Sequence, residues 1–207
     1  MKARAGVLIS GSGSNLQALM GAAAAGAPFE IATVISNNPE AYGLTRATQA
    51  SVPAHAIDHR PFGKDRAAFE AEVTSALRAA DVEWVALAGF MRVLTPGFVA
   101  AWTGRLINIH PSLLPLFPGL NTHARALEAG MAVHGCTVHH VTEGVDEGPI
   151  IGQACVPVRP DDTPETLAAR VNRAELRLYP AALAYAVTGQ APPIAPEADG
   201  LIALLRP

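Results

Sequence analysis

Cysteine and charge are both scarce in this sequence. Only two of the 207 residues are cysteines, Cys136 and Cys155, and both lie in apolar segments. We therefore expect buried thiols, and neither a disulfide framework nor a cysteine metal site. Charged residues make up 16% of the chain, the net charge is −3, and there is no basic run. Since a nucleic-acid partner requires a basic stripe, this composition argues against one.

The sequence also lacks a hydrophobic run long enough to span a bilayer. The longest apolar stretches are interrupted by Arg92 or by glycines well short of that length. The opening segment, MKARAGVLISG, shows no signal-peptide cleavage site. Because half of the residues are hydrophobic, a disordered chain is excluded. We expect a soluble, globular, cytoplasmic protein without a membrane partner.

Strand-length apolar segments alternate with helical patterns along most of the chain. Their continuous apolar character is typical of a parallel sheet covered on both faces. Two later segments, 134–142 and 149–158, are joined by a loop too short for a crossover helix and should pair antiparallel. We predict an α/β fold: a doubly wound, mostly parallel twisted sheet with an antiparallel strand pair near the C-terminal side. The parallel strands are expected at 5–10, 30–38, 54–58, 82–89 and 106–109, with helices from Asn15, at 41–50 and at 62–80.

The last predicted helix begins at Pro164. Asp162 can cap it, with Glu165 at the capping-box position, and Pro180 should end or kink it. From residue 188 the chain is proline-rich and is expected to form a loosely packed arm. The predicted organisation is therefore a single domain over 1–187 followed by an arm over 188–207.

A glycine-rich loop, GSGSN, separates the first strand from the first helix. Glycines there let the backbone approach a phosphate at the helix N-terminus. A dinucleotide site would need a glycine in place of Leu16 and an acid after the second strand, where Ser36, Asn37 and Asn38 stand. The absence of a following lysine excludes a triphosphate loop. Two interpretations remain: a pocket for a single phosphate, or a tight turn that needs glycine for its geometry.

A second candidate site lies where the strand 106–109 gives way to the stiff segment PSLLPLFPG. Asn108 and His110 are two residues apart in an extended segment, so both can address one ligand atom. Ligands of open α/β sheets bind at such carboxyl ends of strands. This position favours a functional pair over a structural one.

The acidic loop EGVDEGPI, residues 143–150, joins the two antiparallel strands. It is either an ordinary hairpin tip or a partner for His110. In the second case, Asp146 beside the imidazole would orient the ring and form an acid/base centre. His139 could support this cluster, whereas His140 should face the other way. Asn108 and a protonated His110 can donate to an oxyanion, which suits acyl transfer without a serine or cysteine nucleophile. No histidine pair has zinc-motif spacing, so no metal is expected.

Long motifs in the same order and spacing identify a resemblance to the phosphoribosylglycinamide formyltransferase family. They are GSGSNLQAL, LAGFMRVLTPGFV, LINIHPSLLPLFPGLNTH, HGCTVHHV and EGVDEGPII, and the resemblance extends from about Val7 to Pro180. It implies transfer of a formyl group from 10-formyltetrahydrofolate to the amine of glycinamide ribonucleotide, in purine biosynthesis. Both substrates are small molecules, no metal is involved, and the protein would be a monomer or homodimer. The N-terminal half, about 1–100, would bind the ribonucleotide phosphate, and the C-terminal half would carry the catalytic and folate loops.

The resemblance also implies roles for individual residues. The catalytic set would be Asn108, His110 and Asp146. The ribonucleotide would be held by Gly13, Ser14, Asn15 and Glu175. The folate would lie against Met91, Arg92, Val93, Leu94, Val99, Leu106, His140, Val141, Thr142, Glu143 and Gly144, and a cis peptide is expected between Leu114 and Pro115. The chain departs from the family pattern at Leu116, where a basic residue is frequent, at His140, where an aromatic is common, and at Asn172, where a glutamine is found.

Three rival functions remain open. Formyltetrahydrofolate deformylase has a similar core and uses water in place of the amine, but normally carries an extra N-terminal domain. Methionyl-tRNA formyltransferase has arginine-glycine in place of FPG and a basic C-terminal domain. The third rival, a nucleotide-binding module without catalysis, would bind ligand at GSGSN and keep the His/Asp cluster for structure alone.

Overall fold

The computed structural model describes residues 1–192, 194 and 202–205, and it divides into two compact units, residues 1–108 and 109–207. The first unit alternates strands and helices. Its elements are β1 (Ala3–Ile9), α1 (Ser14–Ala24), β2 (Phe29–Ser36), α2 (Tyr42–Gln49), β3 (Ala54–Ala56), η1 (Arg60–Phe62), α3 (Arg66–Ala79), β4 (Trp84–Leu87), α4 (Pro96–Ala101) and the start of β5 (Leu106–His110).

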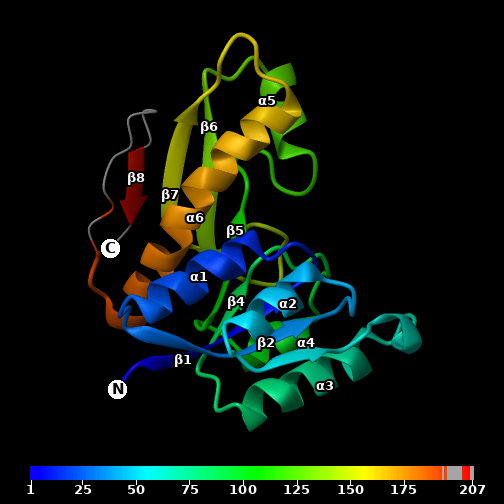
Figure 1. The fold of residues 1–207 in the computed structure, drawn as a ribbon. Coiled ribbons are helices and arrows are strands. Elements are labelled where there is room, and N and C mark those ends of the chain that lie inside the picture. Colours follow the sequence, from blue (N-terminus) through cyan, green and yellow to red (C-terminus); the bar gives the residue numbers. More distant parts are fainter. Residues whose placement is uncertain (193, 195–201, 206–207) are drawn as a thin grey trace. The chain divides into compact units, whose positions relative to one another are not determined.

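The strands of the first unit form a parallel sheet. Their order is β3-β2-β1-β4-β5, and each neighbouring pair is parallel. Helices α1 and α2 lie on one side of β1 and β2, and α3 lies on the other side (Figure 1). β1 is buried from Ala5 to Ile9, because helices cover both of its faces. The prediction of a doubly wound, mostly parallel sheet is confirmed.

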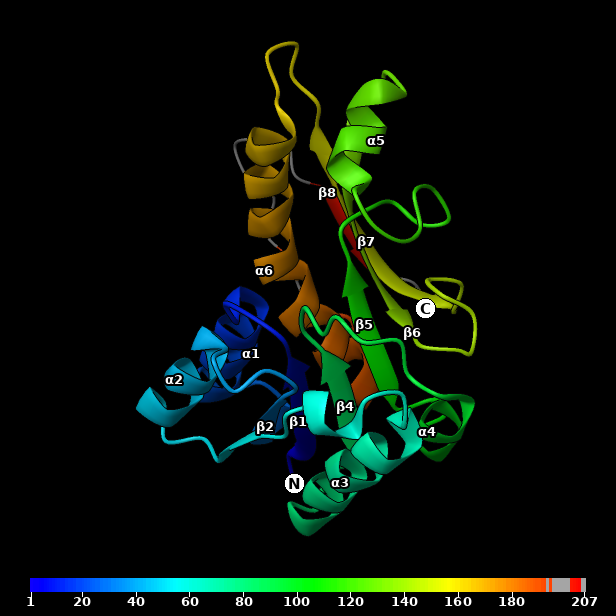
Figure 2. The same cartoon turned by 90° about the vertical axis from the view of Figure 1, so that its right-hand side faces the viewer.

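The second unit is built on antiparallel strands and one long helix. It contains α5 (Thr122–Glu128), β6 (Val133–His140), β7 (Ile150–Pro157), α6 (Pro164–Thr188) and β8 (Ile202–Leu205). β6 and β7 pair antiparallel, as predicted, and β8 pairs antiparallel with β7. Helix α6 packs against β6 and β7 (Figure 2). Its inward stripe includes Leu167, Val171 and Leu178, all fully buried.

The ends of two helices differ from the predicted ones. The helix predicted over 62–80 begins at Arg66, because the Asp65 carboxylate caps it by accepting from the Ala68 N–H at 3.0 Å. At the start of α6, Thr163 rather than Asp162 is the cap. Thr163 and Thr166 bond reciprocally in place of Glu165.

Asp162 has a different partner from the one that the sequence suggested. Its carboxylate forms a two-pronged ion pair with Arg170, with distances of 2.6 and 2.8 Å, and this pairing holds the pKa of the Asp162 carboxyl well below its usual range. The guanidinium also donates to the Pro157 carbonyl, so it ties the end of β7 to α6.

Of the two outcomes predicted for Pro180, an end or a kink of the helix, the first is wrong. The helix continues to Thr188 and ends at Gly189, whose φ of 69° is in the left-handed region. The hydrogen bond that proline removes is tolerated because buried side chains flank it on both sides, including Leu178, Tyr179, Ala182 and Leu183.

The predicted arm over 188–207 is described only in part. Residues 202–205 form β8, whose partners on β7 are Gly152 to Cys155. The rest of the prediction falls largely on residues 193, 195–201 and 206–207, which lie outside the described residues. No helix in the described part of the chain is long and apolar enough to cross a membrane.

Candidate active site

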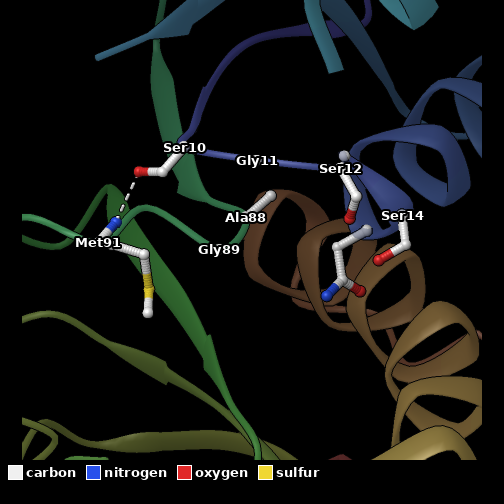
Figure 3. Close-up of a pocket in the computed structure, with 9 residues that line it drawn as sticks. Ser10, Gly11, Ser12, Ser14, Ala88, Gly89 and Met91 are labelled. Atoms are coloured by element: carbon white, nitrogen blue, oxygen red, sulfur yellow. Dashed lines mark hydrogen bonds between the residues drawn. The ribbon is translucent and has the colours of Figure 1, made fainter. Parts of the chain in front are cut away.

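The glycine loop lies at the carboxyl end of β1 and borders a pocket of about 240 Å³ (Figure 3). Gly13 precedes α1 and has a φ of 72°, a conformation that glycine adopts without strain. The N-terminal end of α1 is the positive end of the helix dipole, which makes this end suitable for an anion. The pocket is lined by Ser10, Gly11, Ser12, Gly13, Ser14, Asn15, Ala88, Gly89 and Met91. The structure thus places the predicted phosphate-binding residues together in one hollow.

Helix α2 holds the loop from behind. The Gly43 N–H donates to the Gly11 carbonyl at 3.0 Å, and Arg46 Nε donates to the Ser12 carbonyl at 2.9 Å. A Cβ atom at Gly13 would lie 2.7 Å from the Gly43 Cα atom, so the two backbones approach more closely than a side chain permits. The glycines therefore serve this packing as well as any ligand.

The expected folate-binding segment of the first unit follows β4. Met91 and Val93 expose 68% and 60% of their surface, which is unusual for large apolar residues and leaves them available to a ligand. Val99 and Leu106 are instead buried in the core of the first unit. For these residues and for Arg92 and Leu94, a role in folate binding stays a prediction.

Two acceptors flank the ring of His110 at the end of β5. Nε2 lies 3.0 Å from the Phe117 carbonyl oxygen, and Nδ1 lies 3.3 Å from Asp146 Oδ2. Because a carbonyl oxygen can only accept, Nε2 must carry a hydrogen in this arrangement, and a protonated ring donates on both sides. The ring is 6% exposed, and Asn108 precedes it by two residues on the same strand.

Asp146 is held in place by its own loop and by the neighbouring segment. Its φ of 58° is left-handed, which turns the carboxylate toward His110, and its Oδ2 accepts from the Gly119 N–H at 2.8 Å. His139 Nε2 lies 3.8 Å from Oδ1. The structure therefore brings Asp146, His110 and His139 together, as the sequence predicted.

His139 is buried on β6 with its Nδ1 2.9 Å from the His140 carbonyl oxygen, to which it donates. Burial lowers the pKa of His139, and the His140 carbonyl and the Asp146 carboxylate partly oppose this effect. Burial also lowers the pKa of His140, the next residue.

The loop that carries Asp146 borders a pocket of about 290 Å³. Its lining is Leu114, Pro115, Pro118, Asp146, Glu147, Gly148 and Ile150. The peptide bond between Leu114 and Pro115 is cis, as the resemblance implied. Sequence reasoning missed the roles of Phe117 and Gly119, because both act through backbone groups that leave no signal in residue type. Of the other predicted folate residues, His140 ends β6 and 141–144 precede Asp146 in the loop that follows.

Glu175, the predicted ribonucleotide ligand on α6, is 7% exposed and accepts from Asn172 Nδ2 at 3.0 Å. Asn172 is one of the departures from the family pattern, and here it contacts the acid itself. A second departure, Leu116, exposes 46% of its surface. Among the described residues, no group of three or more His, Cys, Asp or Glu side chains could hold a metal ion.

The comparison with known families decides the class of this chain. A family model described as formyl transferase matches residues 3–183. The chain belongs to the formyl transferase family. Phosphoribosylglycinamide formyltransferase of Escherichia coli (strain K12) is 44% identical over 185 residues, which cover 89% of this chain and 87% of that protein.

Other members of the formyl transferase family agree in structure. The crystal structure of phosphoribosylglycinamide formyltransferase from Brucella melitensis matches with a TM-score of 0.87 and 50% identity, covering 92% of this chain and 98% of that one. The trifunctional purine biosynthetic protein adenosine-3 of Drosophila melanogaster is 53% identical over 191 residues, or 91% of this chain. This chain spans only 14% of that relative's length.

His134 on β6 and His123 on α5 form a pair of histidines near His110. His134, 1% exposed, packs edge-to-face on His123, with 5.3 Å between ring centroids. Burial, with smaller contributions from His123 and His110, lowers the pKa of His134 to about 4. Burial also lowers the pKa of His123. Both rings are therefore uncharged at neutral pH.

We expect His134 to make the protein less stable in acid. In the unfolded chain its ring protonates near pH 6.5, in the folded protein only near 4. Between these values the unfolded state binds more protons, so the free energy of unfolding falls as the pH decreases, by roughly 3 kcal/mol in all for this group. Urea unfolding at several pH values between 7.5 and 4 measures this loss.

The matched comparison uses two glutamine variants. His134→Gln should flatten the decline in stability between pH 6.5 and 4, whereas His55→Gln, at an exposed position on β3, should retain it. A decline equally steep in His134→Gln and in the unmodified protein would show that His134 does not carry the effect.

Proposed function

We propose that the chain transfers the formyl group of 10-formyltetrahydrofolate to the amine of glycinamide ribonucleotide, yielding formylglycinamide ribonucleotide and tetrahydrofolate. The observation that carries the proposal is the His110–Asp146 pair in a formyl transferase fold. His110 lies at the end of β5, and the Gly119 N–H holds the Asp146 carboxylate beside it. The names of the bacterial relatives, which match over most of their length, support the same substrate.

In this proposal the two substrates use the sites described above. The phosphate of the ribonucleotide binds at Gly13–Asn15, where backbone N–H groups and the end of α1 favour an anion. Glu175 assists with the ribonucleotide. The folate lies along Met91–Leu94, Val99, Leu106 and the loop 140–144. One catalytic domain over 1–187 would combine these functions, in a cytoplasmic enzyme that is a monomer or a homodimer.

The chemistry needs no enzyme nucleophile, because the substrate brings its own amine. The amine nitrogen attacks the formyl carbon, and the formyl oxygen becomes an oxyanion that accepts from Asn108 and from His110, whose Nε2 exchanges the Phe117 carbonyl for the oxyanion. The bond between the formyl carbon and N10 of the folate then breaks. The nitrogen of the amine loses a proton by a route involving Asp146, and N10 gains one, so the proton count balances.

The acceptor distinguishes this function from its rivals. We expect purified protein to convert 10-formyltetrahydrofolate to tetrahydrofolate only when glycinamide ribonucleotide is present. The change in absorbance during the conversion measures this turnover. Equal turnover without the ribonucleotide would mean that water is the acceptor, as in a deformylase. Ligand binding without any turnover would instead support a nucleotide-binding module.

A further inference from the structure

Ser10, the residue that follows β1, is hydrogen-bonded on two sides. The Met91 N–H donates to Ser10 Oγ at 2.8 Å, and the Ser10 hydroxyl donates to Asn37 Oδ1 at 2.5 Å. A single hydroxyl thus joins segments that follow three different strands of the first unit, β1, β2 and β4. Since the hydroxyl donates its one hydrogen to Asn37, its lone pairs are directed toward Met91.

Asn37 is placed so that its carbonyl faces Ser10. It is 4% exposed, its backbone N–H donates to the Ile9 carbonyl at 3.4 Å, and its backbone carbonyl accepts from His59 Nδ1 at 2.9 Å. These two backbone contacts hold Asn37 in place beside Ser10. From the sequence, Asn37 was notable only because a dinucleotide site would need an acidic residue in this place.

The bond between Ser10 and Met91 links the two walls of the first pocket. One wall is the glycine loop, Ser10 to Asn15, and the other is Ala88, Gly89 and Met91 (Figure 3). The Met91 side chain is 68% exposed, so packing fixes it weakly. The Met91 backbone N–H, however, donates to Ser10 and so ties this segment to the glycine loop. This bond comes after the one from the Ala88 N–H to the Leu8 carbonyl, which continues the sheet past β4.

We propose that Ser10 is a positioning residue that couples the ribonucleotide site at Gly13–Asn15 to the folate site at Met91–Leu94. The inference rests on the proposed function, which assigns one substrate to each wall. A phosphate that orders the glycine loop also orders Ser10, and the ordered hydroxyl holds the Met91 backbone in the position that the folate meets. By thermodynamic linkage the folate must strengthen ribonucleotide binding by the same factor.

The experiment measures this factor directly. The dissociation constant of tetrahydrofolate, which carries no formyl group to transfer, is determined by titration calorimetry with and without saturating glycinamide ribonucleotide. We expect the ribonucleotide to tighten tetrahydrofolate binding in the unmodified protein. In Ser10→Ala this enhancement should fall by about 3- to 10-fold, the net contribution of one hydrogen bond.

Two further variants separate coupling from a general disturbance. Ser10→Thr keeps the hydroxyl and should keep most of the enhancement. Ser12→Ala removes a hydroxyl from the same pocket but leaves the bond to Met91, so it should retain the enhancement even if ribonucleotide binding itself weakens. Hydrogen exchange of the Met91 amide in the ligand-free protein should quicken in Ser10→Ala alone.

The outcomes are distinct. An unchanged enhancement in Ser10→Ala, or an equal loss in Ser12→Ala, would overturn the proposal while the transferase function stands. Faster exchange at Met91 with unaltered coupling would reduce Ser10 to a structural role and also overturn it. A wild-type protein that turns over the formyl-folate without the ribonucleotide would instead refute the proposed function.

Discussion

Replacement of His110 by alanine is expected to lower kcat by about 10²–10³-fold, the usual effect of removing one oxyanion donor. The loss should exceed any effect on substrate binding, because a donor to the oxyanion acts mainly in the transition state. Removing the ring also removes the group whose Nδ1 lies 3.3 Å from the Asp146 carboxylate. Steady-state kinetics with both substrates varied measure kcat and the two KM values.

The control is His55→Ala, since His55 is exposed on β3 and far in sequence from every residue assigned to catalysis. Its kcat should equal that of the unmodified protein. Asn108→Ala should resemble His110→Ala, and circular dichroism should show that both variants remain folded. Turnover near the original level in either variant would show that the catalytic assignment is wrong.

Gly148→Ala is expected to lower kcat by about as much as His110→Ala, although Gly148 contributes no reacting group. A Cβ atom at Gly148 would collide with the backbone carbonyl of His140, at the other end of the same loop. A carbonyl in a strand cannot rotate away as a side chain can, so the loop must move. Asp146, two residues away, would then leave its position beside His110.

Gly144→Ala is the matched comparison within the same loop. There the added Cβ atom meets the end of the Glu147 side chain, which is flexible and can turn aside. We expect a clearly smaller loss of kcat than in Gly148→Ala, measured in the same assay. Equal losses would mean that the loop responds to any added side chain and that the His140 contact is not decisive.

The fold could be predicted because its signals are local. Continuous apolar runs such as VEWVALAG mark buried parallel strands. Asn108 and His110 were proposed as site residues because they lie at a strand end, and Asp146 because a carboxylate between two apolar strands is costly. The prediction failed where a distant partner decides the outcome. Asp162 has the residue type of a cap but pairs with Arg170 across the turn, and Pro180 would break an isolated helix but lies within a buried face.

Other parts of the site left no trace in residue type. Gly119 contacts Asp146 through its backbone N–H and Phe117 contacts His110 through its carbonyl, and every residue carries these groups. Ser10 and Asn37 are common polar residues whose pairing depends on the order of strands in the sheet. The short helices α4 and α5 were not predicted, because six and seven residues carry too little periodicity to be recognised.

The left-handed backbone at Asp146 limits what this position can become during evolution or in a designed library. With a φ of 58°, the site admits glycine, asparagine and aspartate readily, and penalises β-branched or longer side chains before any chemistry is considered. A glutamate would keep the charge but would combine backbone strain with a longer reach. Variation at the proposed catalytic carboxylate is thus confined to asparagine and glycine, neither of which carries a charge, so selection for a shifted activity should act on the surrounding histidines first.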